Sequence, residues 1–211
     1  RDFVPVAPIN SSDLVLVAHP SLAASNIKEL VALAKSKPGK LNYASSGPGT
    51  PYHMAGELFK SMSGTFIVHV PYRGSSGART DVIGGQVPLM FSNLPTVMTH
   101  IQSGKLKAIG ITDSARTTSA PQIPTLQEQG VSGVVVTSWY GLLAPKGMPV
   151  ALANQLARDV ADILNKPATV EQLKAQALTV WLQTPAEFGA HIKAETASWA
   201  RIIKAKNISL E

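Results

Sequence analysis

The chain has no cysteine among its 211 residues. This absence excludes disulfide bridges, thiolate metal sites and a cysteine nucleophile, and it suits an oxidising compartment as readily as the cytosol. No apolar run approaches the roughly 20 residues that are needed to span a bilayer. The start of the sequence, Arg1 to Val6, has neither a methionine nor the layout of a signal peptide. We therefore expect that a leader or a longer N-terminal segment has been removed.

The motifs of several enzyme classes are missing as well. There is no Gly-x-Ser-x-Gly elbow, no Walker lysine loop and no His-Glu-x-x-His pair. His191 and Glu195 share a helix face and are most simply a solvated pair, and the other histidines lack metal-ligand spacing. We therefore expect no catalytic residues, no cofactor and no metal site.

Acidic residues are outnumbered, with 13 of them against 19 lysines and arginines, for a net charge of +6. The positive residues are scattered and are not interleaved with aromatics, which argues against a nucleic-acid partner. A diffuse positive field instead favours small anions that enter a cleft. The hydrophobic content of 45% is enough for a proper core.

Strands and helices are expected to alternate through the first half of the chain. Periodicity predicts strands at 13–18, 41–44, 66–70, 87–91 and 106–111. It predicts helices between them, at 27–34, 50–62, 76–83 and 95–101. Such alternation, with short glycine-containing links, predicts an α/β fold with a largely parallel sheet and ligands at the carboxyl ends of its strands.

The second half has less sheet. Residues 112–133 are rich in Ser, Thr, Pro and Gln around a possible short helix at 125–129, and this is the expected boundary. Strands are expected at 134–143 and 179–182, and the last helix should begin at Thr184 to Glu187, a capping box. Two strands are too little sheet for the helices to cover, so a partner chain or a further N-terminal segment should complete this part. Self-association through the incomplete sheet is therefore one expectation.

Two glycine-rich turns that each join a strand to a helix are the candidate binding sites. Helix N-termini offer unpaired N–H groups and a positive dipole end to anions. The first turn holds Ser45, Ser46, Gly47, Gly49 and Thr50, with His53 one helical turn further on. The alternatives are an ordinary N-cap turn and, for His53, a histidine on the helix surface or in packing.

The second turn holds Arg73, Gly74, Ser75 and Ser76, in which Arg73 can form a charge-assisted pair with a carboxylate or can be merely solvated. Asn93 follows another strand and can donate from its amide or cap the next helix. The two turns and Asn93 are our candidate ligand contacts.

Several stretches, in order along essentially the whole chain, carry a resemblance to a known family: Arg1–Val6, Lys37–Thr50, Ala55–Phe59, His69–Gly74, Gly85–Phe91, Ser103–Ala108, Ile123–Leu126 and Ser138–Pro145. The sequence resembles the substrate-binding receptors of tripartite tricarboxylate transporters, called Bug receptors. The resemblance implies a periplasmic, two-lobed protein of the type II periplasmic-binding-protein class. It would close on a small carboxylate, a di- or tricarboxylate or an aromatic acid, and present it to a membrane permease.

The resemblance also implies a division into lobes. Residues 1–13 would cross from the first lobe, 14–131 would form a complete second lobe, and 132–211 would return to the first. The opening portion of the first lobe, with a glycine-rich loop that helps to hold the ligand, is not in this sequence. The alternatives are a truncated receptor fragment that does not transport, and an α/β enzyme that binds a phosphorylated substrate at Ser46–Thr50.

Overall fold

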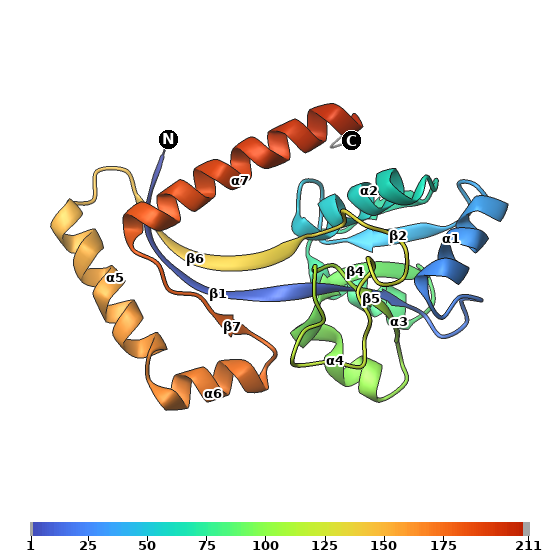
Figure 1. The fold of residues 1–211 in the computed structure, drawn as a ribbon, viewed down its shortest axis with the longest axis horizontal. Coiled ribbons are helices and arrows are strands. Elements are labelled where there is room, and N and C mark those ends of the chain that lie inside the picture. The colour runs from blue at the N-terminus through green and yellow to red at the C-terminus, as the bar shows by residue number, and fades with distance from the viewer. Residues whose placement is uncertain (1, 209–211) are drawn as a thin grey trace. The chain divides into compact units, whose positions relative to one another are not determined.

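The computed structural model describes residues 2–208, which divide into two compact units (Figure 1). Unit 1 contains the residues up to Ser12 together with Trp139–Ile208. Unit 2 is the continuous segment Asp13–Ser138. The boundaries predicted from the sequence fall after residues 13 and 131, and the assignment of the segments to lobes stays a prediction.

The sheet of unit 2 has the strand order β3-β2-β4-β1-β5. Its members are β1 (Phe3–Ala18), β2 (Asn42–Ser45), β3 (Val68–Pro71), β4 (Leu89–Asn93) and β5 (Lys107–Ile111). The expected parallel pairing holds for β2 with β3 and with β4, but β1 runs antiparallel to both β4 and β5. The sheet is therefore mixed. A strand that is buried on both faces is a continuous apolar run in either direction, so the sequence carried no signal for the direction of β1.

Helices follow the strands of unit 2 closely. They are α1 (Ile27–Ser36), α2 (Pro51–Ser63), α3 (Ser75–Ile83) and α4 (Leu94–Gln102). In Figure 1, α2 and α4 lie on opposite sides of the sheet. Large side chains between the sheet and its helices are fully buried, among them Tyr43, Phe59 and Phe91. Each of α2, α3 and α4 begins within a few residues of the strand before it, which places their N-termini beside the strand ends.

The short helix expected at 125–129 does not form. Its capping signal is real, because the Thr125 N–H donates to Glu128 Oε2 at 2.8 Å and the Glu128 N–H donates to Thr125 Oγ1 at 3.1 Å. The chain nevertheless turns away at Gly130, where φ is +98°. The segment between Pro124 and Gly130 is too short to repay the cost of a helix nucleus. It is a turn that carries a capping box.

Unit 1 combines the first part of β1 with β6 (Thr137–Pro145), β7 (Thr179–Val180) and the helices α5 (Val150–Leu164), α6 (Pro167–Ala175) and α7 (Pro185–Lys206). The expected capping box opens α7. The strand expected at 179–182 shrinks to two residues, which pair with Asn10 and Ser11 of β1. No helix within residues 2–208 is both long and apolar enough to cross a membrane.

Side chains from β6, from α7 and from Trp181, which follows β7, form the aromatic part of the core of unit 1. Phe188 is fully buried and packs edge-on against the rings of Trp139 and Trp181. Glu195, which was expected to pair with His191 in solvent, accepts a hydrogen bond of 2.8 Å from Trp139 Nε1. His191 packs against Trp181 instead, with ring centroids 4.6 Å apart. The expectation of a solvated pair was wrong because strand β6 supplies a half-buried donor, Trp139 Nε1, that the helix sequence alone cannot reveal.

Candidate functional site

Three helix N-termini meet at one edge of the unit 2 sheet. Strands β3, β2 and β4 are neighbours and run parallel, so their carboxyl ends, and the helices that follow them, share this edge. The N-cap residues of α2, α3 and α4 are Thr50, Gly74 and Asn93, and none of them caps its helix with its side chain. The positive ends of three helix dipoles therefore point to this edge, and Pro51 in α2 and Pro95 in α4 each leave one N–H fewer in the first turn of the helix.

Hydrogen bonds between the turns fix this edge. The Tyr72 N–H donates to the Ser45 carbonyl at 3.1 Å, and the Gly74 N–H donates to the Ser46 carbonyl at 3.2 Å, so the two glycine-rich turns are joined. On the other side, the Asn93 N–H donates to the Tyr52 hydroxyl at 3.3 Å, which links β4 to α2. The two glycine-rich turns and the junction of β4 with α4 are thus linked to one another by hydrogen bonds.

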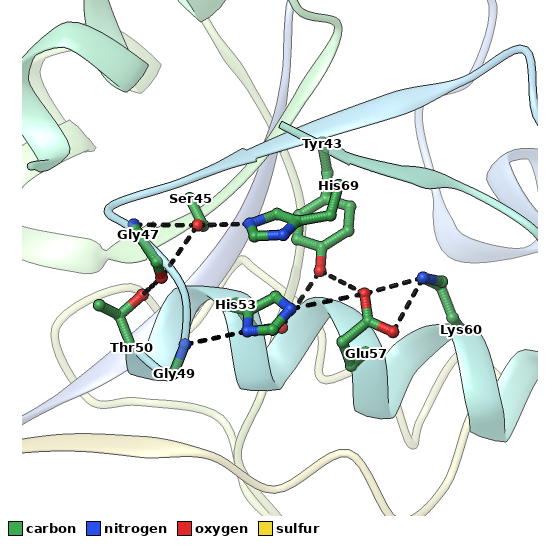
Figure 2. A network of polar contacts seen from close by, with 9 residues as sticks. All are labelled: Tyr43, Ser45, Gly47, Gly49, Thr50, His53, Glu57, Lys60 and His69. Carbon is green, nitrogen blue, oxygen red and sulfur yellow. Dashed lines mark hydrogen bonds and ion pairs between the residues drawn. The ribbon is translucent and has the colours of Figure 1, made fainter. Parts of the chain in front are cut away.

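The first turn is folded back on itself (Figure 2). The Gly47 N–H donates to Ser45 Oγ at 3.1 Å, and the Thr50 hydroxyl donates to the Gly47 carbonyl at 2.7 Å. The Gly49 N–H donates to His53 Nδ1 at 3.1 Å. Both glycines have positive φ, +129° at Gly47 and +73° at Gly49, where a side chain would be strained. The Gly47 and Gly49 N–H groups and the Thr50 hydroxyl, which were predicted to face a ligand, therefore already have partners in the turn and in His53.

A buried polar network lies behind this turn. The rings of His53 and His69 stack at 4.1 Å, and Tyr43 stacks on His69 at 5.0 Å. The Tyr43 hydroxyl donates to Glu57 Oε1 at 2.7 Å, and Lys60 Nζ donates to both Glu57 oxygens at 2.8 Å. His69 Nε2 lies 2.6 Å from Ser45 Oγ, which connects the network to the turn.

Burial keeps both imidazoles neutral. It lowers the pKa of His69 to about 4, with a further contribution from the neighbouring His53, and it also lowers the pKa of His53. Burial raises the pKa of the Tyr43 hydroxyl, and the Glu57 carboxylate raises it further. At neutral pH the network therefore holds two neutral rings, a neutral phenol and one Glu57–Lys60 ion pair.

Acid should destabilise unit 2 through His69. The pKa of His69 is about 4 in the folded chain, below its ordinary 6.5, so the unfolded chain takes up the proton first as the pH falls. This stability is complete above pH 6.5 and is lost between pH 6.5 and about 4. Allowing for the partial exposure of the ring, we expect a loss of about 1–2 kcal/mol, measured by urea unfolding across this range. The His69→Gln chain is the control, and an identical pH dependence in both chains would contradict the assignment.

The second turn lies more openly. Arg73 and Gly74 are exposed, Ser75 is half-buried and Ser76 is exposed. Gly74 has φ of +106°, and a Cβ there would meet no atom within 4 Å, so the glycine serves the backbone conformation rather than close packing. The Arg73 side chain is thus free to reach an anion at the edge where α3 begins.

The junction of β4 with α4 is buried. Asn93 is only 3% exposed and pairs across the sheet with Leu14. The structure thus brings Asn93 to the same edge as the two glycine-rich turns, while His53, at 2% exposure, lies beneath the first turn rather than at its surface. The roles of these residues in ligand binding stay predictions.

Sequence reasoning missed Tyr43, Glu57, His69 and Tyr52. A signal for three of them existed. Tyr43 and Ser45 lie two apart on β2 and so share a face, and Tyr43 is directly opposite His69 in the parallel pairing. His53 and Glu57 are four apart on α2 and share a helix face. Only the packing of α2 on β2 brings these two faces together, and periodicity alone does not supply that.

The architecture of the two units is that of the type II periplasmic binding proteins. A solved R. palustris protein in complex with adipate superposes with a TM-score of 0.94 at 30% identity, covering 99% of this chain and 70% of that one. MatC from Rhodopseudomonas palustris with bound malate gives a TM-score of 0.89 at 25% identity, covering 95% of this chain and 69% of that one.

Residues 1–208 match the family described as the tripartite tricarboxylate transporter family receptor, and the chain belongs to this family. The protein BugT of Bordetella pertussis is 34% identical over all 211 residues. The match covers 100% of this chain and 65% of BugT, so the chain spans less than two thirds of that relative's length. The resemblance found in the sequence is confirmed.

Proposed function

We propose that this chain belongs to a periplasmic solute receptor that captures a small carboxylate and delivers it to the membrane permease of a tripartite tricarboxylate transporter. The observation that carries the proposal is the group of three helix N-termini without side-chain caps at one edge of the unit 2 sheet. Such an edge suits a carboxylate because N–H groups and dipole ends stabilise negative charge without a buried counter-charge. Binding would need no chemical step.

Dicarboxylates are the ligand class that we favour. Two similar proteins were solved with adipate and with malate, and both of these acids carry two carboxylates. A rigid edge built from backbone donors recognises the carboxylate group but not the chain between two such groups. The rest of the selectivity for di- or tricarboxylates, or for aromatic acids, would then come from other parts of the receptor.

Replacing Arg73 with alanine should weaken binding of adipate and malate. A charge-assisted hydrogen bond to a carboxylate contributes about 1.5–3 kcal/mol, so we expect the dissociation constant to rise by about 10- to 100-fold. Isothermal titration calorimetry on the purified chain is the measurement. Arg79→Ala is the control, since Arg79 lies on α3 and its loss changes the net charge equally. Equal affinities of the Arg73→Ala and Arg79→Ala chains would remove Arg73 from the site.

Native mass spectrometry of the purified chain tests the proposal as a whole. A receptor with high affinity should carry a carboxylic acid from the expression host, and denaturation should release it in stoichiometric amount. A chain that holds no acid after purification and binds neither adipate nor malate on titration would contradict carboxylate capture by this chain.

A further inference from the structure

In the polar network beneath the first turn, most donors and acceptors can be assigned. The proposed function does not itself depend on this assignment. His53 Nδ1 accepts the Gly49 N–H, so the proton of this ring must lie on Nε2, which faces Glu57 Oε1 at 3.8 Å. Ser45 Oγ accepts the Gly47 N–H at 3.1 Å, so its own proton is left to donate elsewhere. The two glycine N–H groups of the turn therefore point inward, toward the network.

The Ser45 proton has two possible acceptors. His69 Nε2 lies at 2.6 Å and the Gly47 carbonyl at 3.3 Å. The Gly47 carbonyl already accepts the Thr50 hydroxyl at 2.7 Å and the Thr50 N–H at 3.3 Å. The short distance and the occupied carbonyl both favour donation to His69. Each imidazole thus acts as a hydrogen-bond acceptor for the turn, directly in His53 and through Ser45 in His69.

We propose that Ser45, His53 and His69 are positioning residues that hold the Ser46–Thr50 turn in the shape that binds a carboxylate, and that they do so only while both imidazoles are acceptors. The inference rests on the proposed function, because it names the support of the same site. With its inner N–H groups fixed by this network, the turn presents the start of α2 to the ligand. A proton on either ring converts an acceptor into a donor.

Protonation has a specific consequence at each ring. A proton on His53 Nδ1 would face the Gly49 N–H, donor against donor. A proton on His69 Nε2 would force Ser45 to turn its own proton toward the crowded Gly47 carbonyl. The charged groups around the rings are Glu57 and Lys60, which pair with each other at 2.8 Å and so largely offset one another. Because the rings stack at 4.1 Å, a first proton opposes a second.

Two substitutions keep a hydrogen-bond acceptor in place of the imidazole but remove the group that takes up a proton. In His53→Asn the amide oxygen can take the place of Nδ1, and in His69→Gln it can take the place of Nε2, yet neither amide binds a proton in this range. His53→Phe keeps a ring for stacking and removes the acceptor. His100→Asn on α4 is the matched control for the loss of a histidine that lies outside the network.

The experiment is calorimetric titration with adipate and malate from about pH 8 to pH 4, combined with amide hydrogen exchange at Gly47 and Gly49. Because both acids themselves take up protons as the pH falls, wild type is compared with the His53→Asn/His69→Gln chain at each pH. At neutral pH the double variant keeps both hydrogen-bond acceptors, so we expect it to bind more tightly than His53→Phe. In acid, wild type should lose about tenfold more affinity than the double variant. His53→Phe should bind about tenfold more weakly at neutral pH, with faster exchange at Gly49.

The outcomes separate the two proposals. If wild type and the double variant have the same pH profile, or if His53→Phe matches His100→Asn in both affinity and Gly49 exchange, the positioning role is overturned. If the wild-type chain binds neither acid at any pH, the proposed function fails for this chain. In that case hydrogen exchange still tests the positioning role. Unchanged exchange at Gly49 in His53→Phe overturns this role, and faster exchange supports it.

Discussion

Replacing Gly56 with alanine will destabilise unit 2 by about 3 kcal/mol or more. Gly56 is a buried residue in the middle of α2, and a Cβ there would overlap the ring of Tyr43. That ring cannot move away easily, because it is 2% exposed, stacks on His69 and donates its hydroxyl proton to Glu57. Urea unfolding followed by circular dichroism measures the effect. The substitution improves helix propensity, so the loss would come from packing alone.

A second helical glycine supplies the matched control. Gly77 lies in α3, and a Cβ there would meet only Tyr72 Cδ1 at 3.5 Å, an ordinary contact. Gly77→Ala should therefore stabilise the chain by up to about 1 kcal/mol, the opposite sign for the same substitution. In a Tyr43→Leu background, Gly56→Ala should cost less, because the overlapping ring is gone. Similar losses in the Gly56→Ala and Gly77→Ala chains would contradict the contact between α2 and β2.

Periodicity predicted the order of strands and helices in unit 2, because each element is a periodic apolar stretch that ends near a glycine or a proline. It did not predict that β1 continues from Phe3 or that it runs antiparallel within the sheet. Those properties depend on the pairing of β1 with strands that are far away in the sequence, and periodicity does not report such pairing. The helix predicted at 125–129 did not form although its capping signal was correct, because the segment ends at Gly130 and is too short for a helix.

The sequence predicted where the candidate site residues lie in the sheet, but it did not predict the contacts that they make. The rule that ligands bind at the carboxyl ends of parallel strands drew attention to the turns after β2 and β3 and to Asn93. The structure places these residues at one edge of the sheet, and their roles in binding stay predictions. The sequence could not show that the Thr50 hydroxyl donates to the Gly47 carbonyl instead of pointing outward. Nor could it show that His53 supports the turn from within, because an inward and an outward histidine have the same spacing.

Replacing Phe188 with alanine will destabilise unit 1 by about 3–5 kcal/mol. Its side chain is fully buried, and its ring centroid lies 5.5 Å from that of Trp139 and 5.8 Å from that of Trp181. Truncation would leave a cavity between α7 and β6, and the two tryptophans would lose edge contacts of the kind that aromatic rings favour. Tryptophan fluorescence during urea unfolding reports on this place directly, because both neighbours of the cavity are fluorophores.

Two further variants distinguish a cavity from a general loss of hydrophobicity. Phe3→Ala makes the same chemical change at a residue of β1 that is 65% exposed, and should cost less than about 0.5 kcal/mol. Gly141→Ala on β6 would push a Cβ into the ring of Phe188, so alone it should destabilise the chain. In the Phe188→Ala background that Cβ enters the vacated space, and its cost should shrink or reverse. Strictly additive effects at Gly141 and Phe188 would mean that β6 and α7 do not pack as the structure has them.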